Sequence, residues 1–168
     1  MVNYELGSNF LRTKKFPEAS FYLSKISKGN PLFIDAQYKL GMIHIVQKNY
    51  GQAINHFEAV SDELKKATVS QFTFNLSNFQ FNFGLCHFRE QNYAQAINHF
   101  IQMPNDHASY IDAQYHLGVC HFFIGNYEQA FEYLTQIPEG HAKFPGAQTK
   151  LKELKESLTK ALEEMFKN

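Results

Sequence analysis

Histidine and cysteine are the residues of this sequence whose spacing first invites a chemical interpretation. His44, His87 and His121 each follow a glycine by three residues, and Cys86 and Cys120 directly precede two of them. Zinc sites usually bring ligands together from positions a few residues apart. Adjacent residues of a helix point about 100° apart, so a Cys-His dipeptide does not chelate one ion. No two of the eight histidines lie three or four residues apart, and we expect no metal and no cofactor.

Motifs for other chemistry are missing from the sequence. It has no phosphate-binding glycine loop, no Gly-x-Ser-x-Gly elbow and no His-Glu-x-x-His pair, so we expect no enzyme activity. Sixteen basic residues balance sixteen acidic ones, and no basic stripe indicates a nucleic-acid partner. No apolar run reaches the roughly 18 residues that would span a membrane. The start of the sequence is unlike a signal peptide, so we expect a cytoplasmic protein. Its expected partner is another protein or a peptide, which it would hold.

A repeat positions these residues along the chain. Four glycines mark it, Gly7, Gly41, Gly84 and Gly118; the first and last intervals are equal, and the middle one is longer by nine. Around each glycine, apolar or small residues recur at the same offsets. They are Leu6, Leu40, Phe83 and Leu117 (one before); Phe16, Tyr50, Tyr93 and Tyr127 (nine after); Ala19, Ala53, Ala96 and Ala130 (twelve after); Leu23, Phe57, Phe100 and Leu134 (sixteen after); and Ile26, Val60, Met103 and Ile137 (nineteen after).

The pattern within one repeat predicts a helical hairpin. Apolar residues three and four apart share one face of a helix, and this spacing occurs on both sides of a short turn. The turns contain Asn49, Asn92 and Asn126, and asparagine favours turns and helix N-caps. Glycine in the first helix and alanine in the second let two helices cross at about 8–10 Å. One hairpin does not bury its own apolar face, so successive hairpins must stack.

The sequence resembles the tetratricopeptide repeat, a helix–turn–helix unit of about 34 residues. The phrases that carry the resemblance are Asp35-Ala36-Gln37-Tyr38-Lys39-Leu40-Gly41, Asp112-Ala113-Gln114-Tyr115-His116-Leu117-Gly118 and Asn126-Tyr127-Glu128-Gln129-Ala130. The resemblance implies an all-α, right-handed solenoid with repeats at about 1–33, 34–67, 77–110 and 111–144, forming one domain over 1–168.

If the chain folds as such repeats, its histidines and cysteines are expected to pack in the core rather than to react. His44, His87 and His121 occupy the place of a tyrosine in the family. Equivalent positions of successive repeats lie about 10 Å apart, which exceeds the ~7 Å Cα limit of a disulfide. Cys86 and Cys120 should therefore be free, buried thiols of a reducing compartment.

Two segments fall outside the four repeats. An insertion at 68–76 without proline or glycine is expected to lengthen the first helix of the third repeat, with a bulged loop as the alternative. Residues 145–167 are expected to form an amphipathic capping helix that begins near Pro145. Leu151 and Leu154 should bury against the fourth repeat near Phe131 and Leu134. The distal residues should extend beyond it and contact another chain; they are Leu158, Leu162, Met165 and Phe166.

The first helices have a second apolar face. The resemblance implies that first helices line a concave groove for peptides, and an apolar groove would suit an amphipathic helix. The groove candidates are Tyr4, Tyr38, Met42, Ile45, Phe81, Asn82, Leu85, Phe88, Tyr115, Val119 and Phe122. Only Asn82 fits the family's clamp for acidic carboxy-terminal peptides, so we expect a different ligand. The residues three before and one after each glycine should be more exposed than those four after it.

Two hypotheses for function remain open from the sequence. The groove residues could hold a peptide or helix of a partner, as in an adaptor, scaffold or chaperone. Alternatively, the groove and the terminal helix could pack against other copies of the chain and form a homo-oligomer. A structural explanation of the same residues is that they pack laterally against adjacent repeats, as any solenoid requires.

Overall fold

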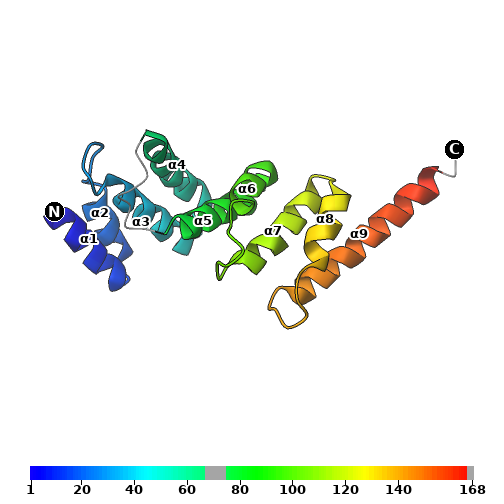
Figure 1. Ribbon diagram of the computed structural model, residues 1–168. Coiled ribbons are helices and arrows are strands. Elements are labelled where there is room, and N and C mark those ends of the chain that lie inside the picture. Colours follow the sequence, from blue (N-terminus) through cyan, green and yellow to red (C-terminus); the bar gives the residue numbers. More distant parts are fainter. Residues whose placement is uncertain (67–74, 166–168) are drawn as a thin grey trace. The chain divides into compact units, whose positions relative to one another are not determined.

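The computed structural model describes residues 1–66 and 75–165, and in these residues the secondary structure is helical without strands (Figure 1). The helices are α1 (Val2–Arg12), α2 (Phe16–Leu23), α3 (Phe33–Val46), α4 (Tyr50–Lys66), α5 (Leu76–Arg89), α6 (Tyr93–Phe100), α7 (Tyr110–Phe123), α8 (Tyr127–Thr135) and α9 (Phe144–Met165). They fall into two compact units, 1–90 with α1–α5 and 91–168 with α6–α9.

The helices pack as hairpins because small residues stand at their crossings. In the first unit α1 packs on α2, α3 on α4, and α4 on α5. In the second unit α7 packs on α8, and α9 packs on both. A Cβ added at Gly41 would lie 2.2 Å from Cε1 of Phe57, and one added at Gly118 would lie 2.6 Å from Cγ of Leu134. Only a missing side chain permits such contact.

The predicted core positions are confirmed. The alanines twelve residues after each glycine are 0 % exposed, and the residues sixteen after are at most 1 % exposed. The residues nineteen after, Ile26, Val60, Met103 and Ile137, are also buried. The all-helical fold expected from the repeat spacing is therefore confirmed.

The turns inside the hairpins close differently from the prediction. Asn92 and Asn126 do precede α6 and α8, but neither side chain accepts a capping hydrogen bond. Instead, the residue before the asparagine adopts a left-handed conformation, with φ of 60° at Lys48 and 80° at Gly125. The next backbone N–H then donates to a carbonyl five residues back, as from Asn126 to His121 at 2.9 Å. This closing of the first helix is the Schellman arrangement.

The insertion changes α4 rather than α5. The sequence predicted a longer first helix in the third repeat, but α5 has the same 14 residues as α3 and α7 and begins after Asn75. The prediction is wrong at the N-terminus of α5, because the Asn75 side chain accepts a hydrogen bond from the Asn78 N–H and caps the helix there. The lengthened element is α4, with 17 residues. The rest of the predicted insertion, residues 68–74, lies outside the described residues.

Candidate functional site

The apolar face of the first helices is the first candidate site, and in the first unit Tyr4 lies on it. The Tyr4 hydroxyl donates to Asp35 of α3, and Lys39 pairs with the same carboxylate at 3.2 Å. The Lys39 Nζ also lies 5.4 Å from the centre of the Tyr4 ring. Tyr4 therefore joins α1 to the next first helix.

Tyr38 makes the equivalent connection from α3 to α5. The Asn82 side-chain amide donates to the Tyr38 hydroxyl at 3.3 Å. Burial raises the pKa of Tyr38, which keeps the phenol neutral as a hydrogen-bonding group. The ring also packs against Phe57, with centroids 5.9 Å apart.

Tyr115 repeats the arrangement in the second unit, where it connects α7 to α9. A Cβ added at Gly146 of α9 would lie 2.8 Å from the Tyr115 hydroxyl, and Lys143 lies 5.4 Å from the ring centre. All three tyrosines thus contact the helix that follows their own hairpin. Their partners Asp35, Lys39 and Lys143 were not predicted from the sequence; Asp35 and Lys39 belong to the first half of α3, and Lys143 directly precedes α9.

The remaining predicted groove residues divide by burial. Met42 and Ile45 are half-buried and pack against the core of the first unit, and Phe81, Asn82, Leu85 and Phe88 are also half-buried. Phe122 is half-buried, beneath Lys150 of α9 at 5.0 Å from its ring centre. Val119 is only 3 % exposed. The expectation that residues just after the glycine are the more exposed ones is therefore wrong at Val119, where α9 packs against α7.

His44 and His121, three residues after Gly41 and Gly118, each stack on a ring from the second helix of their own hairpin. His44 stacks on His56 of α4 with centroids 5.2 Å apart, and His121 stacks on Tyr133 of α8 at 5.5 Å. The Nδ1 atoms of His44 and His121 are buried without a hydrogen-bond partner. Burial lowers the pKa of both residues, which favours neutral rings. Their role is packing between the helices of a hairpin.

The two cysteines are free and buried, as predicted. Burial raises the pKa of Cys86 to about 12, and the charge of Glu90 acts in the same direction. Burial also raises the pKa of Cys120 to about 12. Such thiols are poor nucleophiles and poor metal ligands at neutral pH. Across residues 1–66 and 75–165, no three His, Cys, Asp or Glu side chains are arranged to hold a metal ion.

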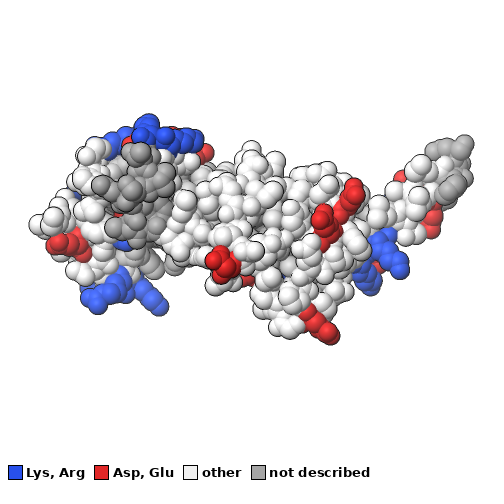
Figure 2. Space-filling view, in the orientation of Figure 1, with Lys and Arg blue, Asp and Glu red and all other residues white. Residues whose placement is uncertain are grey.

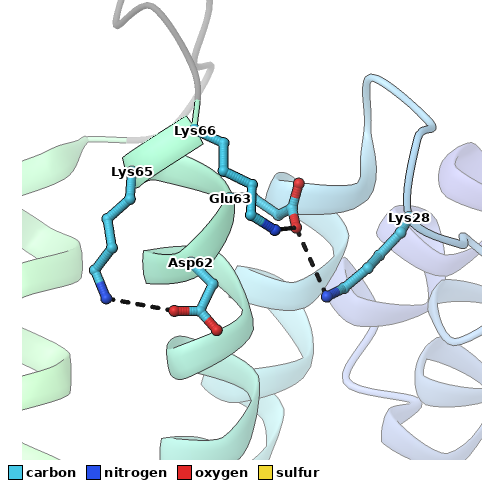
Figure 3. A network of polar contacts seen from close by, with 5 residues as sticks. All are labelled: Lys28, Asp62, Glu63, Lys65 and Lys66. Carbon is cyan, nitrogen blue, oxygen red and sulfur yellow. Dashed lines mark hydrogen bonds and ion pairs between the residues drawn. The ribbon is translucent and has the colours of Figure 1, made fainter.

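A group of charges gathers where α4 ends (Figure 3). Glu63 pairs with Lys66 at 3.0 Å and with Lys28 at 3.7 Å, and Asp62 pairs with Lys65 at 3.4 Å. The hydrogen bond from Lys66 lowers the pKa of Glu63. The three lysines are at least 65 % exposed, so these surface pairs contribute little stability. They attach the segment after α2 to α4 and form no chemical site.

The terminal helix provides the second candidate surface. Leu154 is buried and Leu151 is half-buried, as the sequence predicted. Leu158, Leu162 and Met165 are 42 %, 54 % and 74 % exposed, while the side chain of Phe166 lies outside the described residues. Phe131 of α8 was expected beside the buried leucines but is itself 55 % exposed.

Phe131 forms one wall of a shallow groove of about 540 Å³ between α8 and α9. The other wall belongs to α9, and its apolar residues are Leu151, Leu154, Leu158 and Leu162. Among the helices of the described chain, none is both long and apolar enough to cross a membrane. The four leucines make the groove an apolar surface on α9, a helix that otherwise carries many charges.

The sequence matches a known protein family but no curated protein. The tetratricopeptide repeat family matches residues 35–63 and 112–143, which are the second and fourth repeats. No curated protein gives a significant match to the sequence.

Solved structures share the fold at low identity. One crystal structure of MamA is 19 % identical with a TM-score of 0.71, covering 92 % of this chain and 85 % of that one. A second is 18 % identical with the same TM-score of 0.71, covering 96 % and 87 %. MamA from Desulfovibrio magneticus RS-1 is 18 % identical with a TM-score of 0.60, covering 80 % and 71 %. The repeat spacing, the buried positions and the family match together show that residues 35–63 and 112–143 are tetratricopeptide repeats, and the solved structures share the chain's fold.

Proposed function

We propose that this protein is an interaction module that holds a peptide or an amphipathic helix of a partner protein. Tetratricopeptide repeats support a role as a protein-interaction scaffold. We assign no catalytic step, because the buried thiols and neutral histidines serve packing. The two free thiols support a reducing compartment such as the cytoplasm.

The observation that carries the proposal is the apolar surface shared by α3 and α5. These two first helices contact each other, and the hydrogen bond from Asn82 to Tyr38 fixes one against the other. Met42 and Ile45 of α3 and Leu85 and Phe88 of α5 are half-buried on this side. Apolar side chains held by rigid helices lose little freedom on binding, which suits a groove for a helix.

The tyrosines have a supporting role in this proposal. Tyr4, Tyr38 and Tyr115 each contact the helix that follows their own hairpin, so we expect each to set the spacing of the helices within its own unit. In the second unit, Phe122 lies beneath Lys150, which places a cation beside an aromatic ring of that unit. An amphipathic helix with an acidic edge would complement that pair.

The test is selection of peptides from a randomised amphipathic-helix library against the full chain. Fluorescence polarisation then compares a selected peptide on the parent, on Ile45→Ala and on Leu85→Ala. Loss of an anchor should weaken binding by at least ~2 kcal/mol, about thirtyfold. Phe21→Ala is the matched control, because Phe21 is an apolar side chain on α2 that is 57 % exposed.

Three outcomes would count against the proposal. Selection could yield no peptide, or the peptides could bind all variants equally, which would place binding elsewhere. If Ile45→Ala or Leu85→Ala abolished helical circular dichroism, the side chain would belong to the core. Unchanged helicity with weakened binding supports the groove.

A further inference from the structure

The sequence and geometry at the start of α9 match those at the start of α7. His141-Ala142 follows His107-Ala108, and Ala147-Gln148 follows Ala113-Gln114, by the same interval that separates Gly84 from Gly118. The Nδ1 of His107 accepts the Ser109 N–H at 3.1 Å, and that of His141 accepts the Lys143 N–H at 3.2 Å. Ala147 is 0 % exposed, as is Ala113. α9 is therefore the first helix of a fifth repeat.

This fifth repeat departs from the others where a second helix would pack. Lys152 stands one repeat length after Gly118, at the crossing position that elsewhere requires glycine. First helices α3, α5 and α7 turn back after 14 residues, whereas α9 continues to 22. The additional turns, 158–165, contain Leu158, Leu162 and Met165. The side of α9 that would receive a second helix is consequently open, and the groove with Phe131 lies along it.

We propose that α9 of a second copy of this chain occupies this groove, antiparallel to the first. A two-fold pair covers both copies of the same apolar surface at once, because each α9 supplies a groove and an apolar stripe. The residue two after the glycine position is apolar and buried in four first helices: Ile43, Cys86, Cys120 and Leu154 in α3, α5, α7 and α9. Ile43 and Cys86 belong to core clusters that include the second helix of the preceding repeat.

The other end of the chain does not offer this surface. In α1 the residue at that position is Asn9, which is exposed. A head-to-tail stack would therefore place a polar amide against the apolar groove, leaving that amide without water. The tail-to-tail pair avoids this cost.

The charges of α9 favour the antiparallel direction. Lys152 and Lys155 line the first part of the groove. Glu163, one turn beyond Thr159, lines an adjoining hollow of α9 that shares Lys152, Lys155 and Thr159 with the groove. In the face drawn in Figure 2, basic side chains of α9 lie nearer its start and acidic ones nearer its end. Antiparallel copies bring Glu163 of one toward Lys155 of the other, whereas parallel copies oppose like charges. The shared length from Leu151 to Met165 is roughly 20 Å, so the pair should be weak, in the micromolar range.

Sedimentation equilibrium of the full chain across the micromolar range tests the proposal. The parent should dimerise, and Leu162→Glu should weaken the dimer by at least about tenfold, because it buries a charge. Lys160→Gln is the matched control: it makes the same change of one negative charge on α9, at a residue that is not among those lining the groove. It should leave the dimer within about twofold. Met165→Glu, at a position 74 % exposed, repeats the test should Leu162→Glu lose helicity.

The direction is tested by exchanging charges. Lys155→Glu should weaken the dimer, and Lys155→Glu with Glu163→Lys should restore it. A parent that stays monomeric, a dimer that survives both Leu162→Glu and Met165→Glu, or an open-ended polymer would overturn the proposal. A charge exchange that restores nothing would overturn the antiparallel pairing. None of these variants touches the surface of α3 and α5, so the peptide-binding proposal stands or falls separately.

Discussion

Gly41→Ala measures how closely the helices of one hairpin approach. An added Cβ would lie 2.2, 2.7 and 2.9 Å from three atoms of the Phe57 ring. To reach ordinary contact, the nearest ring atom must retreat from 2.2 Å to at least 3.4 Å, a shift of more than an ångström. Phe57 is 0 % exposed and packs against Tyr38 and Phe79, with centroids 5.9 and 5.5 Å away. The ring therefore has no free direction.

The expected loss of stability combines two opposing effects. Overpacking a core costs about 1–3 kcal/mol, and a ring held on all sides belongs at the upper end. Alanine gains about 1 kcal/mol over glycine in a helix interior. The net loss is about 2 kcal/mol, which lowers Tm by about 4–8 °C for a chain of this size.

Thermal melts followed by circular dichroism give the measurement. Gly51→Ala is the control, since Gly51 is a helical glycine of α4 with nothing within 4 Å of an added Cβ. That variant should melt at or slightly above the parent temperature. Adding Phe57→Leu to Gly41→Ala should recover part of the loss, giving a coupling energy of at least about 0.5 kcal/mol. Gly41→Ala as stable as the parent would refute the crossing geometry.

Three further predictions concern other contacts. Burial lowers the pKa of His44, so its contribution to folding stability is intact above the unfolded pKa of about 6.5 and is lost as pH falls toward the lower folded pKa. His44→Tyr should therefore reduce the fall in Tm between pH 7.5 and pH 5.5, measured by calorimetry. An unchanged dependence of Tm on pH would contradict this. Tyr38→Phe removes the hydroxyl that accepts from Asn82 and should cost about 0.5–1.5 kcal/mol in urea unfolding; no loss would show that this bond does not stabilise the pair α3–α5. Leu154→Ala should lower the free energy of unfolding by about 2–5 kcal/mol, and Leu162→Ala by less than about 0.5 kcal/mol in dilute solution. Equal losses in chemical unfolding would contradict a buried first part and an exposed distal part of α9.

The helices and their core could be predicted because equivalent residues at the same offsets make the same contacts in every repeat. Ala53, Phe57 and Val60 are fully buried for the reason that Ala19, Leu23 and Ile26 are, so one pattern serves every hairpin. Turn closure was less predictable. A left-handed Lys48 has no distinctive sequence signal, since lysine is not a residue that favours that conformation.

The candidate site was only partly predictable. The apolar face of the first helices was visible in the sequence, but whether Tyr38 meets a partner or a neighbouring helix depends on the position of Asn82, 44 residues away. The amphipathic character of α9 was predicted from its leucines, but its likeness to a first helix was not, although His141, Ala147 and Leu151 repeat His107, Ala113 and Leu117 one repeat length later. Lys152 in place of the glycine conceals that repeat.

The contacts inside each unit have a consequence for folding kinetics. The main helix contacts join α1 to α2, α2 to α3, α3 to α4, α4 to α5 and α3 to α5, and in the second unit α6 to α7, α7 to α8 and α9 to both α7 and α8. Every partner is thus one or two helices away along the chain. Low contact order of this kind is typical of domains that fold within microseconds to milliseconds. Opening should then proceed from an end, and the amides of residues 158–165 should exchange with deuterium before those of α7, whose helix is packed by α6, α8 and α9.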